Sequence, residues 1–182
     1  QYKGKQKIIV SSDKDFFQLC DDETIIYRPI QNEIITKGVL TNKYGIHPNN
    51  FALARAIVGD KSDNLPGIKG VGLKTVAKRF PFLANEEESS CKEIVTNCAM
   101  QGKRLKLHEN IIKSADLVKN NYKIMQLYDP NIRPINRHMI DNIINHFEPE
   151  FSKLNFTKML FSDDVSYLNF EELNNILKKI KR

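Results

Sequence analysis

Four aspartates occur in this sequence as two close pairs. Asp13 and Asp15 follow the apolar run Lys7–Val10, and Asp60 and Asp63 follow a second apolar stretch. Two carboxylates this close repel each other unless a positive group lies between them. Carboxylate oxygens suit Mg²⁺ or Mn²⁺, and two such ions form the usual clamp for phosphodiester hydrolysis. The two pairs together therefore predict a two-metal site.

Each pair also has a plainer interpretation, which the residues alone leave open. Asp13 stands where it could cap a short helix that begins near Phe16. The segment Asp60–Gly67 has the Asp, Ser, Asn and Gly content of an ordinary turn.

The second pair carries an electrostatic expectation of its own. Asp60 and Asp63 come just after a predicted helix C-terminus, where the helix dipole is already negative, and Lys61 offers only partial relief. If the repulsion is uncompensated, replacing both aspartates by asparagine should not destabilise the metal-free fold. No histidine stands beside either pair in the sequence. His47 precedes Pro48 and is expected to be a loop or packing residue, so zinc is not expected.

Glycines and lysines follow the second pair. Gly67, Gly70 and Gly72 permit a tight turn and leave backbone N–H groups open at the start of the next helix, which favours an anion site. That helix is predicted for residues 73–80, where Pro81 stops it, and it has one apolar and one basic face. The basic strip consists of Lys69, Lys74, Thr75, Lys78 and Arg79. Such a strip binds phosphates irrespective of sequence, although a merely solvated basic face is the alternative.

The elements that carry these residues can be predicted from the pattern of apolar residues. Lys7–Val10 is apolar on both faces, as in the middle of a parallel sheet, and its neighbouring strands are expected in a segment upstream of Gln1. Thr24–Arg28 and Glu33–Thr36 predict a hairpin, with the first strand at a sheet edge because Pro29 follows it.

Helices are predicted for most of the chain from Pro48 onward. Pro48 offers a helix start, and the apolar stripe that follows ends at Gly59. From Glu86 onward the pattern is mostly helical and predicts a bundle, with Met139, Ile143 and others on one apolar face.

The composition is that of an ordinary globular protein. The 182 residues are 41% hydrophobic and 27% charged, and 28 Lys+Arg against 22 Asp+Glu give a net charge of +6, which favours a polyanionic partner. No apolar run approaches the roughly 20 residues that a membrane span needs, so no membrane partner is expected. Cys20, Cys91 and Cys98 form no CxxC motif and are expected to be buried free thiols in a reducing compartment, the cytoplasm, or the host cytoplasm for a viral protein.

Two longer segments resemble motifs of the structure-specific 5′ nucleases. Val10–Leu19, VSSDKDFFQL, is similar to the SxDxDFxQL segment of that family, and Gly59–Gly72, GDKSDNLPGIKGVG, is similar to its GDxSDNxPGxxGxG segment. The family includes the 5′-nuclease domains of bacterial DNA polymerase I, phage RNase H-type exonucleases and flap endonucleases. Both motifs stand in the family's order and spacing, and the resemblance extends from residue 7 to about residue 80.

The resemblance implies an α/β fold with three regions. Residues 1–45 would be the C-terminal part of a PIN-like parallel-sheet nuclease core with a β-hairpin. Residues 46–82 would be a helix-hairpin-helix, and residues 83–182 a helical C-terminal region. The lack of a polymerase segment after the helices favours a stand-alone, phage-type nuclease, expected to be a monomer.

The resemblance also implies roles for the residues of both motifs. Asp13 and Asp15 would serve the first Mg²⁺ or Mn²⁺, with Asp15 reaching toward the second ion, which Asp60 and Asp63 would serve. The hairpin would grip DNA and could hold a K⁺ through backbone carbonyls. The DNA-binding residues would be Gly67, Lys69, Gly70, Gly72, Lys74, Thr75 and Lys78.

The implied activity is hydrolysis near 5′ ends, as a 5′-3′ exonuclease or flap endonuclease that removes primers and flaps in DNA replication or repair. The substrate would be branched or 5′-ended double-stranded DNA, and an RNA–DNA hybrid is a further expected substrate. The family's N-terminal acidic residues and basic arch have no counterpart in this sequence. This chain alone is therefore expected to cut negligibly until an upstream segment or a second chain completes the site. The alternative function is a non-catalytic helix-hairpin-helix module that binds DNA.

Overall fold

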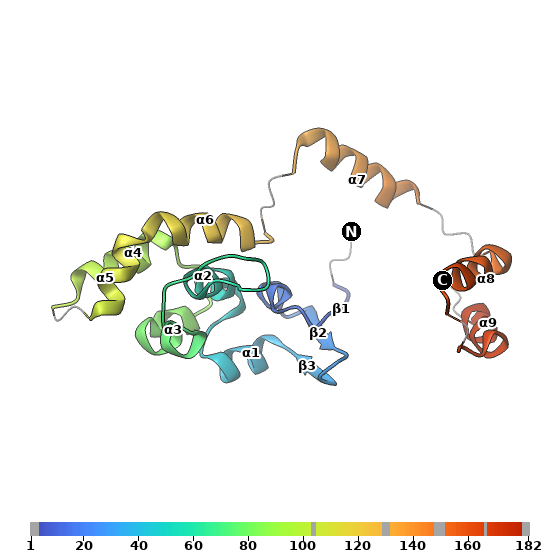
Figure 1. The fold of residues 1–182 in the computed structure, drawn as a ribbon, viewed down its shortest axis with the longest axis horizontal. Coiled ribbons are helices and arrows are strands. Elements are labelled where there is room, and N and C mark those ends of the chain that lie inside the picture. The colour runs from blue at the N-terminus through green and yellow to red at the C-terminus, as the bar shows by residue number, and fades with distance from the viewer. Residues whose placement is uncertain (1–3, 103–104, 129–131, 148–151, 166, 180–182) are drawn as a thin grey trace. The chain divides into compact units, whose positions relative to one another are not determined.

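The computed structural model describes residues 4–102, 105–128, 132–147, 152–165 and 167–179 (Figure 1). The chain divides into two compact units, residues 1–130 and 131–182, and each is described by itself. Neither boundary expected from the sequence, after residue 45 or after residue 82, coincides with this division.

A three-stranded sheet in the order β1-β2-β3 belongs to the first unit. β1 (Lys7–Val10) pairs in parallel with β2 (Thr24–Arg28), and β2 pairs antiparallel with β3 (Glu33–Ile35). The predicted hairpin is confirmed. The parallel pair is joined by η1, a 3₁₀ helix at Lys14–Leu19, and this crossover places both aspartates of the first pair just beyond β1.

The predicted edge position of β2 is wrong, because β2 is the central strand of the described sheet. Pro29 lies one residue past the last paired position, Arg28, so its missing N–H removes no hydrogen bond from the ladder. β1 is instead an outer strand, and Ile8 and Val10 on it are 59% and 65% exposed.

Among the described residues, six α-helices of the first unit pack around one core. Their bounds are α1 Lys37–Tyr44, α2 Pro48–Val58, α3 Leu73–Arg79, α4 Cys91–Met100, α5 Lys106–Lys113 and α6 Ala115–Met125, with the short 3₁₀ helix η2 at Pro81–Ala84. α2 is the central helix: α6 runs across it on one side, and α1 and α3 lie on the other (Figure 1). The starts and ends of α2 and α3 agree with the sequence prediction to within one residue.

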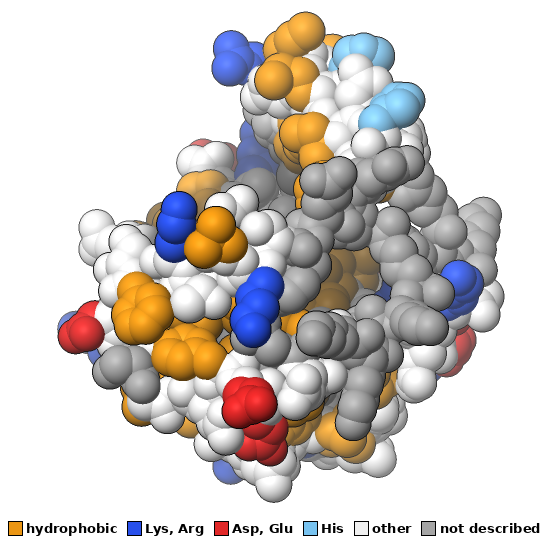
Figure 2. Space-filling model, turned by 90° about the vertical axis from the view of Figure 1, so that its right-hand side faces the viewer, with side chains coloured by type: hydrophobic (Ala, Val, Ile, Leu, Met, Phe, Trp, Pro, Cys, Tyr) orange, Lys and Arg blue, Asp and Glu red, His pale blue; other side chains and the backbone are white. Residues whose placement is uncertain are grey.

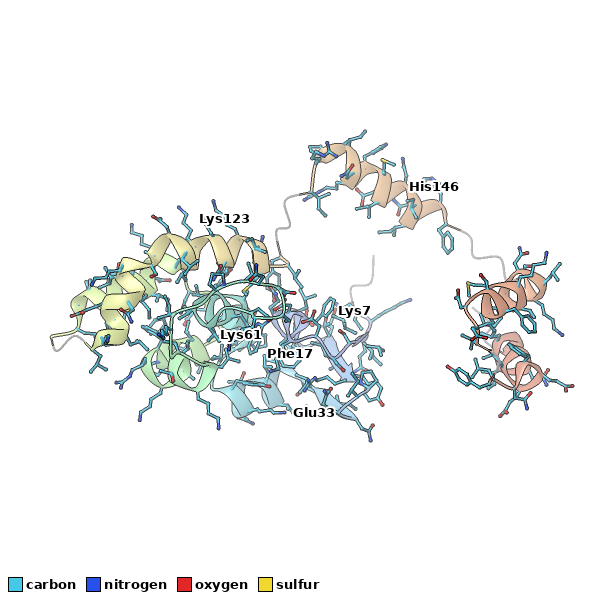
Figure 3. All side chains as sticks on the ribbon, in the orientation of Figure 1. Lys7, Phe17, Glu33, Lys61, Lys123 and His146 are labelled. Atoms are coloured by element: carbon cyan, nitrogen blue, oxygen red, sulfur yellow. The ribbon has the colours of Figure 1, made fainter. Side chains whose placement is uncertain are left out.

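Phe17 anchors η1 in this core. Its side chain is fully buried, and its ring lies 5.4 Å from that of Phe51 on α2 and 6.1 Å from that of Tyr44 on α1 (Figure 3). The first acidic motif lies at the start of η1, and the second follows the end of α2. Because η1 packs against α2, the two motifs are brought to the same region of the unit.

The second unit consists of α7 (Pro134–His146), α8 (Lys153–Ser162) and α9 (Phe170–Lys179). Helices are confirmed here, but the apolar stripe predicted for a bundle is exposed on α7: Met139 is 57% and Ile143 62% exposed. Figure 2 shows hydrophobic side chains at the surface in several separate groups. Among the described residues, no helix is both long and apolar enough to cross a membrane.

Candidate functional site

The loop after α2 turns back tightly on the helix end. Gly59 has a positive φ of 77°, and Asp60 and Leu65 exchange two backbone hydrogen bonds of 2.8 and 2.7 Å. Gly67 then packs against the carbonyl group of Val58, so closely that any side chain at Gly67 would overlap it. The two glycines thus have a steric role in shaping the loop that carries the second aspartate pair.

Asp60 is held by its own loop and by α2. Its Oδ1 accepts hydrogen bonds from the Ser62 amide at 2.8 Å and the Ser62 hydroxyl at 2.5 Å, while Oδ2 accepts one from Arg55. The hydrogen bond from the Ser62 hydroxyl, with those from the Ser62 amide and Arg55, lowers the pKa of Asp60 to about 2. This carboxylate is therefore ionised at any physiological pH.

Asp13 and Asp15 have different roles in the structure. Asp13 caps η1, since its Oδ1 accepts a hydrogen bond of 2.9 Å from the Asp15 amide. The capping interpretation of Asp13 is thus observed, and it leaves the second oxygen of that carboxylate for other ligands. The Asp15 side chain is only 22% exposed and is directed at Arg55.

Arg55 bridges the two acidic motifs. Its Nε and Nη2 donate to Oδ1 of Asp15 at 3.1 and 2.9 Å, and Nη2 also donates to Oδ2 of Asp60. The Arg55 side chain is 11% exposed. Only partial relief of the repulsion, from Lys61, is expected from the sequence, and Arg55 is not among the predicted site residues, although it is the only charged residue in the sequence of α2.

Burial and the ion pairs shift the pKa values of Asp15 and Arg55 in opposite directions. Burial raises the pKa of Asp15, and the neighbouring Arg55 offsets only part of that rise. Burial lowers the pKa of Arg55, but Asp15 and Asp60 outweigh it and hold that pKa above its ordinary value. Arg55 therefore stays charged between the two carboxyl groups.

A polar cavity of about 380 Å³ lies at this junction. Its lining residues are Ser12, Asp13, Lys14, Arg55, Asp60, Ser62 and Asp63. Three of the four predicted aspartates thus line one cavity, and the fourth, Asp15, joins it through Arg55. In the part of the chain that the structure describes, no three His, Cys, Asp or Glu side chains form a group that could hold a metal ion.

The predicted division of α3 into two faces is confirmed by burial. Val76 is fully buried, whereas Lys74 and Lys78 are exposed, as are Lys69 and Gly70 in the preceding turn. Of the other predicted DNA-binding residues, Thr75 is half-buried and Gly72 forms the N-cap of α3.

A buried glutamine ties the first acidic motif to α6. Gln18 is 1% exposed, and its amide nitrogen donates to the carbonyl oxygens of Asp15 at 2.8 Å and Met125 at 2.9 Å. Its amide oxygen accepts a hydrogen bond of 2.8 Å from the Leu127 N–H. Gln18 belongs to the first sequence motif, but the sequence does not indicate its partners.

A buried asparagine ties α6 to the second motif in a similar way. The amide nitrogen of Asn121, a residue 2% exposed, donates to the carbonyl oxygens of Ala56 at 3.0 Å and Pro66 at 2.8 Å. Both motifs are thus hydrogen-bonded to α6, which lies beyond residues 7–80, the segment that carries the sequence resemblance.

Comparison with known proteins finds relatives for part of the chain, and no family model matches it. A "5'-3' exonuclease" of Buchnera aphidicola (subsp. Schizaphis graminum) is 40% identical over 88 residues, which is 47% of this chain and 31% of that protein. A thermostable DNA polymerase I of Thermus aquaticus is 35% identical over 127 residues, 69% of this chain and 14% of the polymerase. The matched segment thus spans less than a third of either protein.

Solved structures with a similar fold come from bacteriophage T5. A T5 protein co-crystallised with metal ions has a TM-score of 0.56 and 20% identity, over 66% of this chain and 44% of that one. A T5 flap endonuclease in a pseudo-enzyme-product complex with DNA and metal ions has the same TM-score and identity, over 66% of this chain and 43% of that one.

Proposed function

Since this chain is homologous to 5′-3′ exonucleases and to DNA polymerase I, the 5′ nuclease family, we propose that it carries part of a metal-dependent 5′ nuclease site. The observation that carries the proposal is the meeting of both acidic motifs at one polar cavity, with Asp13, Asp60 and Asp63 in its lining. The substrate that fits is 5′-ended or branched DNA, cut near the 5′ end during the removal of primers or flaps.

The donor chemistry of the cavity fits Mg²⁺ or Mn²⁺. Its acidic lining offers only oxygen ligands, and the Ser62 hydrogen bonds keep Asp60 ionised. A cation, the guanidinium of Arg55, already lies between two of the carboxylates, which indicates that positive charge is stabilised there. Asp13 and Asp15 would serve one ion, and Asp60 and Asp63 the other.

The bound ions would supply an acidified water molecule and a counter-charge for the leaving oxygen. The chain's own residues do the rest. Asp60 and Ser62 fix the loop of the second motif, and the cap formed by Asp13 fixes that of the first. The exposed lysines Lys69, Lys74 and Lys78 would hold the DNA backbone through its phosphates, as a helix-hairpin-helix does.

Further parts of the site would come from protein sequence outside residues 1–182. The chain matches less than a third of its exonuclease relatives, and β1 leaves its free edge and the apolar side chains of Ile8 and Val10 exposed. A strand added at this edge would pair with the free backbone groups of β1 and could bring more carboxylates to the end of β1.

A second function is favoured by one observation. The bridge through Arg55 occupies oxygens of Asp15 and Asp60, and no group of three metal ligands is found among the described residues. A DNA-binding module without catalysis would be compatible with this arrangement.

Cleavage of a 5′-flap substrate with Mg²⁺, followed on a denaturing gel, separates the two functions. We expect residues 1–182 alone to bind the DNA and cut it negligibly, because Mg²⁺ needs a nearly complete octahedral shell. Adding the natural upstream segment, in cis or as a second polypeptide, should restore cutting that Asp13→Ala or Asp63→Ala abolishes. DNA binding without any cutting, even with that segment present, would leave the binding module as the function.

A further inference from the structure

Arg55 joins two carboxylates that lie far apart in the sequence. Asp15 belongs to the first acidic motif, 40 residues before Arg55, and Asp60 opens the second, five residues after it. The side chains of all three residues are largely buried, with exposures of 11% for Arg55, 22% for Asp15 and 14% for Asp60.

The geometry of the bridge favours a guanidinium over any other cation that the chain could supply. The planar fork of an arginine can donate to two carboxylates at once, whereas the ammonium of a lysine acts as a point charge. Without the guanidinium, two buried carboxylates would face each other with no positive charge between them, which is costly in a partly buried site.

The oxygens used in the bridge are also those that a metal ion would need. Oδ1 of Asp15 and Oδ2 of Asp60 both accept from Nη2 of Arg55, so a single atom of the guanidinium stands where a divalent ion would contact both motifs. The polar cavity of about 380 Å³ that Arg55 lines gives its side chain room to swing away.

We propose that Arg55 is a positioning residue that substitutes for a divalent cation: it holds the two motifs together without metal, and an incoming ion displaces it. This inference rests on the proposed metal site. It predicts that Arg55 stabilises the metal-free fold and weakens metal binding, because the ion must first break the bridge. A purely structural ion pair would stabilise the fold without opposing the ion.

The chain offers a matched control for a purely structural pair. Arg28 is as buried as Arg55, with a side chain 10% exposed, and donates to Glu33 at 3.1 Å across the β2–β3 hairpin and, at 3.4 Å, to the backbone carbonyl oxygen of Ser12. Neither Arg28 nor Glu33 lines the cavity between the two acidic motifs.

The test measures two quantities on the full 182-residue chain and its variants: the melting temperature in EDTA, and the Kd for Mn²⁺ by calorimetry. We expect Arg55→Gln to lower the melting temperature by about 5 °C or more, since a buried charge pair loses its partner. The same variant should bind Mn²⁺ about tenfold more tightly, a change equivalent to about 1.4 kcal/mol. Arg28→Gln should lower the melting temperature without tightening Mn²⁺ binding.

The outcomes separate this inference from the proposed function. If the wild type binds Mn²⁺ and Arg55→Gln binds it equally or more weakly, the displacement is overturned while the metal site stands. If neither binds Mn²⁺, the displacement is overturned, and the proposed function, which expects the site to be completed from outside residues 1–182, is decided by the cleavage assay with the upstream segment. If Arg55→Gln does not fold, Arg55→Lys decides: its single ammonium should bridge less well, so a lower melting temperature with a lower Kd supports the displacement, and an unchanged Kd overturns it.

Discussion

The α-carbon of Gly67 packs directly against the carbonyl group of Val58, at the point where the chain leaves the second acidic motif and returns to the end of α2. A Cβ at Gly67 would overlap the Val58 oxygen. The neighbouring hydrogen bond from the Ile68 N–H to the Ile57 carbonyl, 2.8 Å long, holds the two segments together at this crossing of the loop over the end of α2. Backbone therefore lies on backbone here, and neither segment can yield as a flexible side chain would.

Gly67→Ala should consequently destabilise the fold by roughly 3 kcal/mol, because the added methyl group forces the crossing apart. Gly72→Ala is the matched control: Gly72 has a φ of −120°, and a Cβ there would meet open space. Its cost should stay within about 1 kcal/mol, the difference between glycine and alanine at an N-cap. Urea unfolding of both variants gives the comparison. Equal stabilities would show that the crossing is looser in solution.

Asp60→Asn should destabilise the metal-free protein by about 2 kcal/mol, because Arg55 loses one of its two charged partners. This reverses the expectation from the sequence, in which Asp60 and Asp63 only repel each other. Asp63→Asn is the control, since Asp63 is exposed, and its effect should stay within about 0.5 kcal/mol. Both are measured by urea unfolding in EDTA. A fully stable Asp60→Asn variant would mean that the bridge does not form.

The ion pairs of Glu33 should make stability depend on acid pH. The hydrogen bond from Lys43, together with that from Arg28, lowers the pKa of Glu33 below its ordinary value of 4.5. A lowered folded-state pKa means that the stabilisation is complete above about pH 4.5 and is lost as the pH falls through the folded value. Glu33→Gln should therefore be less stable than the wild type by about 1 kcal/mol at neutral pH.

Unfolding curves at neutral pH and near pH 3 test this for both proteins. The difference between wild type and Glu33→Gln should shrink toward the lower pH, where the carboxyl group is protonated in both states. A gap of constant size would show that Glu33 contributes through packing and not through its charge.

DNA binding should depend on the basic strip through salt-sensitive contacts. Lys69→Ala and Lys74→Ala should each weaken binding to a 5′-flap DNA without changing sequence preference, and each should reduce the slope of log K against log salt by roughly one. Lys113→Ala, an exposed lysine on α5 outside the strip, is the control. Fluorescence anisotropy at several salt concentrations measures the slopes. Wild-type slopes for both strip variants would place the DNA elsewhere.

Local signals explain which elements could be predicted from the sequence. Pro48 and Gly59 mark the ends of α2, and two runs rich in isoleucine on either side of the polar Gln31-Asn32 mark the hairpin, so local patterns are enough to predict these elements. Helix α1 was missed because Leu40 is its only buried residue and Gly38 interrupts its first turn, which leaves no apolar stripe.

Within the candidate site, the aspartates could be found from their spacing, but their partners could not. Arg55 lies 40 residues from Asp15, and Gln18 lies 107 residues from Met125. Contacts of this range depend on how η1, α2 and α6 pack, and no local pattern of residues contains that information.

The hydrogen bonds made by the side-chain amides of Gln18 and Asn121 determine how short a minimal domain around the site can be. A fragment that ended at residue 82 would keep both acidic motifs and the basic strip. It would nevertheless lose Asn121, and with it the hydrogen bonds to the carbonyl oxygens of Ala56 and Pro66, the first of which is buried. Gln18 would lose its partners at Met125 and Leu127 in the same cut. Expression boundaries for the smallest autonomous piece therefore belong beyond residue 127, well past the last recognisable motif.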